Sequence, residues 1–161
     1  MLYLSIAILI VLTGYIMASI IKSKELPKSL SATYYLWPKW VFPAVMIFTG
    51  FGLLPCWLEI TEGHPLQFLV FLSCAGFMFV GASPNYRNNK LENSVHVNAA
   101  YIAAFTAILA LTFIMYEWWY PFYVTALLFL IFFRNIKTHY LFLLELAILE
   151  SSIGSVICAL K

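Results

Sequence analysis

The chain has 161 residues, of which 63% are hydrophobic and 10% are charged, whereas a soluble domain has about 45–50% and about 25%. A globule of this size has too little interior to bury so much apolar surface. Disorder is excluded as well, because a disordered chain needs low hydrophobicity and high net charge. A net charge of +2, spread along the chain, excludes a nucleic-acid-binding protein. The remaining class is an integral membrane protein, and the mean hydropathy of +0.91 agrees with it.

Six segments of the sequence meet or approach the requirement of about 20 mostly apolar residues for a membrane-spanning helix. The first segment has no basic n-region and a long apolar run, so we interpret it as a retained helix and not as a cleaved signal peptide. The fifth segment is long enough only if the aromatic residues 118–120 form its first turn. We therefore predict an all-α, polytopic transmembrane helix bundle that forms one domain over residues 1–161. Its helices are expected at about residues 2–21, 41–58, 66–82, 97–116, 118–133 and 139–160.

The orientation of this bundle follows from its basic residues, which fall in alternate loops. These residues are Lys22, Lys24, Lys28 and Lys39 in the first loop, Arg87 and Lys90 in the third, and Arg134 and Lys137 in the fifth. The other two loops carry only acids, Glu59 and Glu62 in one and Glu117 in the other. Because basic loops remain in the cytoplasm, we predict that both termini lie outside. The expected location is the bacterial inner membrane, with six crossings.

Two acids lie inside the last predicted helix, where polar groups are costly and therefore informative. At about 100° per residue, Glu145 shares a helix face with Ser152 and Ser155, while Glu150 points nearly opposite. No Lys or Arg lies within a predicted span to neutralise either acid. One interpretation is a neutral glutamic acid that hydrogen-bonds a backbone carbonyl and holds helices together. The other is a site that handles protons, cations or a ligand head group, formed by Glu145, Glu150, Ser152 and Ser155.

A second group of polar residues is expected at the cytoplasmic ends of the helices. Ser83 follows the third predicted helix, and His96 and His139 lie at the starts of the fourth and sixth. Together with Glu145 they form a possible cytoplasmic-side cluster. The chain contains no Asp, so the usual partner of a catalytic histidine is missing. We predict no metal site and no cofactor.

Sequence motifs of hydrolases and phosphate-binding loops are absent from the chain. A serine hydrolase would need a base near Ser83, Ser94 or Ser151, and His96 is the plausible base. We therefore assign no catalytic residue from the sequence, which favours a protein other than an enzyme and keeps an enzyme as the alternative.

One stretch, FMFVGASPNYRNNKLENSVHVNAAYIAAF over residues 77–105, resembles six-span bacterial membrane proteins of unknown function. In that pattern a helix ends in a small-residue turn and the next begins at a histidine, which Ser83 and His96 match. The resemblance implies a distant link to the superfamily of the alkaline ceramidases, metal-dependent amidases that use several histidines, an aspartate and a serine. This chain has no aspartate and no second pair of inward-facing histidines, so the amidase activity is not carried over.

The sequence leaves three classes of function open. The first expectation is a small transporter or channel subunit that uses its membrane-embedded glutamates for protons or cations. The second is a protein that binds lipids or apolar ligands, or an accessory subunit of another membrane protein. The third is a membrane-embedded lipid hydrolase. The expected partners are membrane lipids and either further copies of the chain or another membrane protein, and nucleic acid is excluded.

Overall fold

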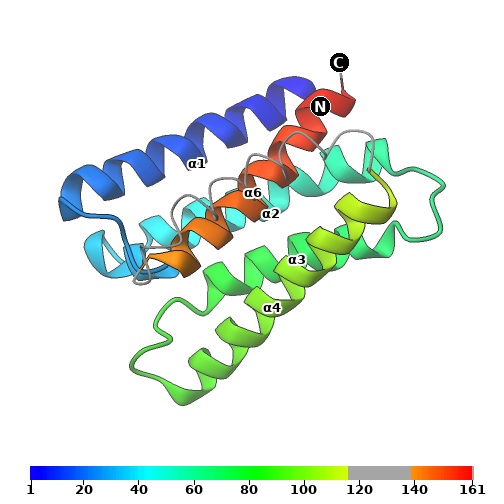
Figure 1. Cartoon of the computed structure of the whole chain (residues 1–161). Helices are drawn as coiled ribbons and strands as arrows, with labels where there is room; N and C mark the ends of the chain where they lie inside the picture. Colours follow the sequence, from blue (N-terminus) through cyan, green and yellow to red (C-terminus); the bar gives the residue numbers. More distant parts are fainter. Residues whose placement is uncertain (116–138, 161) are drawn as a thin grey trace.

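The computed structural model describes residues 1–115 and 139–160, and within these ranges every regular element is a helix. The fifth predicted helix lies outside the described residues. Figure 1 shows the elements α1 (Leu2–Ser23), η1 (Ser31–Leu36, a 3₁₀-helix), α2 (Val41–Ile60), α3 (Phe68–Ala82), α4 (Lys90–Phe113) and α6 (Tyr140–Ala159).

Four of these helices are long and apolar enough to cross a membrane. They are α1, α2, α4 and α6, with 20 to 24 residues each. The apolar helix α3 has 15 residues and is about 22 Å long at 1.5 Å per residue. The chain is therefore a multi-pass membrane protein of the helix-bundle type, as its composition predicts.

The boundaries agree with the prediction except at α4, which begins at Lys90 and not at residue 97. The cause is an N-cap: the Asn89 side chain accepts hydrogen bonds from the backbone N–H groups of Leu91 and Glu92, at 2.9 and 3.3 Å. A capped start lets a polar segment join the helix. As a consequence, His96 lies almost two turns inside α4 and not at its first residue.

Glycines set the close packing of α2, α3 and α4. A Cβ atom on Gly50 of α2 would lie 2.7 Å from the carbonyl oxygen of Cys74 in α3. A Cβ atom on Gly76 of α3 would lie 2.7 Å from the Cβ atom of Ala103 in α4. Small residues at such positions let transmembrane helices approach closely, so these three helices form one tightly packed layer.

Helix α6 connects this layer to α1. The side chain of Trp57, at the end of α2, is fully buried, and its Nε1–H donates to the carbonyl oxygen of Ser152 in α6 at 3.3 Å. Both chain termini lie at the same end of the bundle (Figure 1), and the count of six crossings stays a prediction. The prediction that this end faces outside stays a prediction.

The loop from Lys24 to Trp40 folds over the opposite end of the bundle and carries η1 (Figure 1). Polar contacts fasten it to α1. The hydroxyls of Tyr15 and Thr33 are 2.6 Å apart, and Trp37 Nε1–H donates to Ser19 Oγ at 2.9 Å. The loop therefore has a fixed position against the helices, and its residues can form part of a site.

Candidate functional site

The candidate site begins with a serine and a histidine that lie 65 residues apart in the sequence. Ser31 is the first residue of η1, and His96 projects from α4; their Oγ and Nε2 atoms are 2.8 Å apart. Both residues are buried, with 7% and 5% of their surface exposed. The fold thus brings a hydroxyl from a loop against an imidazole from a transmembrane helix.

The second nitrogen of His96 decides the direction of this hydrogen bond. Nδ1 lies 2.9 Å from the backbone carbonyl oxygen of Ser83, and a carbonyl only accepts, so Nδ1 carries the proton. In a neutral imidazole the other nitrogen is then an acceptor. Ser31 Oγ–H therefore donates to His96 Nε2, which is the arrangement of a nucleophile with its general base.

Aromatic side chains cover one face of the His96 imidazole. The ring of Tyr86 is stacked on the imidazole, with 4.6 Å between centroids and 18° between planes. The Arg87 guanidinium lies over the ring of Tyr35, 4.5 Å from its centroid, and the Arg87 backbone N–H donates to the Tyr35 hydroxyl. These contacts fix the imidazole plane and cover it from that side.

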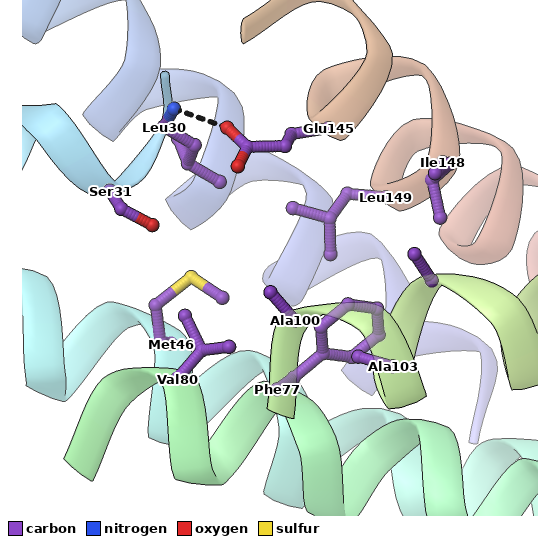
Figure 2. A pocket seen from close by; sticks show the side chains of 11 residues that line it. Leu30, Ser31, Met46, Phe77, Val80, Ala100, Ala103, Glu145, Ile148 and Leu149 are labelled. Carbon is purple, nitrogen blue, oxygen red and sulfur yellow. Dashed lines mark hydrogen bonds between the residues drawn. The ribbon is translucent and has the colours of Figure 1, made fainter. Parts of the chain in front are cut away.

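A cavity of about 50 Å³ adjoins Ser31. Its walls come from η1 and the helices α2, α3, α4 and α6, and Figure 2 shows Ser31 and Glu145 along one side of it. Most of the lining is apolar, and the residues concerned are Leu30, Met46, Phe77, Val80, Ala100, Ala103, Ala104, Ile148 and Leu149. The cavity therefore presents two polar side chains to an otherwise hydrocarbon-like space.

Glu145 is the acid among these residues. Its Oε2 accepts a hydrogen bond of 2.6 Å from the backbone N–H of Leu30, the residue before Ser31. Within the described part of the chain, this is the carboxyl group's one hydrogen bond, and no cation pairs with it. The structure thus gives Glu145 a backbone N–H as its partner, and the interpretation of Glu150 as a neutral acid that bonds a backbone carbonyl stays a prediction.

The predicted cluster of Ser83, His96 and His139 is formed in part. Ser83 contacts His96 through its backbone carbonyl, because its hydroxyl donates to the Phe79 carbonyl at 2.6 Å. His139 lies directly before α6 without a side-chain hydrogen bond to the helix start, and its Nδ1 lies 3.1 Å from the Pro27 carbonyl oxygen. His139 thus holds the loop.

The other predicted residues of α6 lie away from this cavity. Glu150 is partly buried, and Thr13 of α1 donates to its Oε1 at 3.3 Å. Ser152 and Ser155 are fully buried, and their hydroxyls donate to the carbonyls of Ile148 and Ser151 in their own helix. Glu145 and Glu150 therefore belong to different interfaces, as their predicted opposite faces require.

Within residues 1–115 and 139–160, no group of three His, Cys, Asp or Glu side chains lies closely enough together to hold a metal ion. The three cysteines are free.

No protein-family model, curated protein or solved structure matches this chain. The resemblance of residues 77–105 to six-span membrane proteins stays a prediction. The site's own geometry is accordingly the basis for assigning a function.

Ser31 was not among the site residues predicted from the sequence. The serine lies in a loop between spans, in the segment SLSATYY, and no local motif marks it as a nucleophile. The sequence did indicate the base, because His96 was the candidate base for a serine nucleophile. The serines predicted to lie near it were Ser83, Ser94 and Ser151, and Ser31 was not one of them.

Proposed function

We propose that this protein is a membrane-embedded serine hydrolase that cleaves short-chain carboxylic esters. The observation that carries the proposal is the 2.8 Å hydrogen bond from Ser31 Oγ to His96 Nε2. An acceptor imidazole, oriented by a third group on its other nitrogen, is the arrangement that activates a serine hydroxyl. Here that third group is the Ser83 carbonyl.

The reaction follows from these atoms. Ser31 Oγ attacks the ester carbonyl carbon while its proton passes to His96 Nε2. The bond from the carbonyl carbon to the alcohol oxygen then breaks, and His96 returns the proton to the departing alkoxide. A water molecule attacks the acyl group on Ser31, gives its proton to His96, and the carboxylic acid leaves as Ser31 regains its proton.

The cavity supports a short acyl group. At about 50 Å³ it is a third of the size of a cavity that binds benzene, which is about 150 Å³. Its walls are almost entirely apolar, so the acyl group would be a small hydrocarbon chain. Ala100, Ala104 and Glu145 of its lining are only partly buried, so an ester dissolved in the bilayer would approach between α4 and α6.

Turnover of a nitrophenyl ester of acetic acid by the full chain in lipid nanodiscs tests this function. We expect the wild type to release nitrophenolate and the Ser31→Ala variant to fall to the background rate. The His96→Gln variant should lose about 10²–10⁴-fold, the usual contribution of a general base. Ser83→Ala is the matched control, because it removes a hydroxyl that faces Phe79 and keeps the carbonyl that orients His96. A wild type without turnover, or an active Ser31→Ala variant, would contradict the proposal.

A second candidate function is the handling of protons or small cations, as the sequence predicts for a transporter or channel subunit. The observation that favours it is the Glu145 carboxyl in an apolar cavity without a cationic partner among the described residues. Such an acid inside a membrane is typical of ion and proton pathways. A bundle this small would work as an oligomer.

Proteoliposomes that enclose a pH-sensitive dye separate this candidate from the hydrolase. If Glu145 carries protons, the wild type dissipates a pH gradient and Glu145→Gln does not. If the wild type leaves the gradient intact, the second candidate is wrong, and the hydrolase is unaffected by that result.

A further inference from the structure

We infer that Glu145, in its protonated form, is the third catalytic group of the site and donates a hydrogen bond to the ester carbonyl oxygen that Ser31 attacks. This inference rests on the proposed function. It assigns a role to the one acid of the cavity, which the nucleophile and base leave unused.

The first argument is position. The Leu30 N–H holds Glu145 Oε2 at 2.6 Å, so the carboxyl group is fixed to the backbone one residue before the nucleophile. Figure 2 shows the second carboxyl oxygen turned toward the cavity and away from the Leu30 nitrogen. One oxygen of Glu145 is thus an acceptor for Leu30, and the other, which has no hydrogen-bond partner in the described part of the chain, can meet a molecule in the cavity.

The second argument is the apolar surroundings of the Glu145 carboxyl group. The carboxyl lies among Leu30, Met46 and Leu149, and in the described part of the chain no cation pairs with it. Hydrocarbon walls favour the uncharged acid, which has a hydroxyl hydrogen to donate. Carboxylic acids kept neutral by apolar sites stabilise an oxyanion in this way.

The third argument is what the reaction requires. Attack by Ser31 turns the carbonyl oxygen into an oxyanion, which a donor inside an apolar cavity stabilises strongly. The neutral acid keeps its own proton and shares it in a hydrogen bond, so atoms and charge balance without a further reactant. An ionised Glu145 would repel the same oxyanion, and the chemistry therefore uses the protonated form alone.

Two substitutions at Glu145 test this role. Glu145→Gln keeps an N–H donor and an acceptor for Leu30, whereas Glu145→Leu keeps the size and removes both. We expect Glu145→Leu to lower kcat for the nitrophenyl ester by about 10²–10³-fold, the usual cost of removing an oxyanion donor, and Glu145→Gln to keep most of it. Equal kcat in the wild type and Glu145→Leu would overturn the inference, and so would equal losses in both variants.

An infrared measurement on the wild type serves if Glu145→Leu fails to fold. A protonated Glu145 gives a carboxylic C=O band that Glu145→Gln lacks. This band should shift when Ser31 Oγ displaces fluoride from a small fluorophosphonate and forms a phosphonate ester. An unchanged band, or no such band, would overturn the role of Glu145. If Ser31 does not react in the wild type, the proposed function itself fails, so the two failures are distinguishable.

Discussion

At the scale of single residues, the site depends on side chains that reach across from different elements. Ser31 comes from η1, His96 from α4 and Glu145 from α6. The Ser83 carbonyl orients His96, and the Leu30 N–H holds Glu145. The sequence predicted a cluster of Ser83, His96, His139 and Glu145, but it did not place Ser31 or Leu30 beside it. Hydropathy identifies which residues are polar inside spans, but the partner of each one depends on how a loop folds over the helix ends.

Trp57 permits a prediction of stability at this scale. The Trp57→Phe variant loses the hydrogen bond to the Ser152 carbonyl and part of a fully buried ring. We expect its free energy of unfolding to fall by about 1–3 kcal/mol, measured by reversible unfolding in mixed detergent. Trp40, which is 70% exposed, is the control: Trp40→Phe should change the value by less than about 0.5 kcal/mol. Equal effects of the two substitutions would contradict the structure.

At the scale of the elements, caps and glycines position the catalytic groups. The sequence located every described transmembrane helix, because runs of apolar residues are a strong signal. The predicted start of α4 was wrong. Hydropathy places the start of a helix after the last polar residue of the preceding loop, whereas α4 begins directly after its N-cap, Asn89. A rule for capping, applied to the polar segment from Asn88 to Asn93, would have extended the helix.

The Asn89 cap can be tested by its effect on α4. In the Asn89→Ala variant the N–H groups of Leu91 and Glu92 lose their acceptor. We expect a loss of about 1 kcal/mol and faster amide hydrogen exchange in the first turn of α4. Asn93→Ala, a substitution of an exposed residue inside the same helix, should leave this exchange unchanged. Unchanged exchange in Asn89→Ala would show that the cap is unnecessary.

A matched pair of glycine substitutions tests the packing of α3 against α4. Gly76→Ala places a methyl group 2.7 Å from the Ala103 Cβ atom, whereas Gly14→Ala meets no atom within 4 Å. Overpacking of this kind costs about 1–3 kcal/mol, so we expect Gly76→Ala to lower the Tm and Gly14→Ala to keep or raise it. The opposite order of the two Tm values would contradict the close contact.

At the scale of the whole molecule, the sequence predicted a membrane helix bundle from composition alone, and the helices confirm that class. Composition is decisive here because no soluble domain of this size could bury so much apolar surface. Function was not predictable in the same way. The loop that carries Ser31 contains no motif that marks a nucleophile, and its contacts with α1, α4 and α6 arise only in the folded chain.

The orientation of the molecule is a prediction at this scale. Single cysteines at positions 24, 89 and 137 should be modified by a membrane-impermeant reagent from the cytoplasmic side, and a cysteine at position 62 from the outside, in a background without the native cysteines. The reason is the positive charge of the first, third and fifth loops, which contain positions 24, 89 and 137. Modification of position 62 from the cytoplasm would reverse the topology and place the Ser31 site at the outer face.

The most direct test of the central claim is mass spectrometry of the chain after reaction with a small fluorophosphonate in nanodiscs. The account predicts one phosphonyl group per chain, attached to Ser31. The adduct should be absent from Ser31→Ala, slow to form in His96→Gln, and present in Ser83→Ala. A wild-type chain that stays unmodified, or an adduct on another residue that persists in Ser31→Ala, would contradict the assignment of Ser31 as a nucleophile activated by His96.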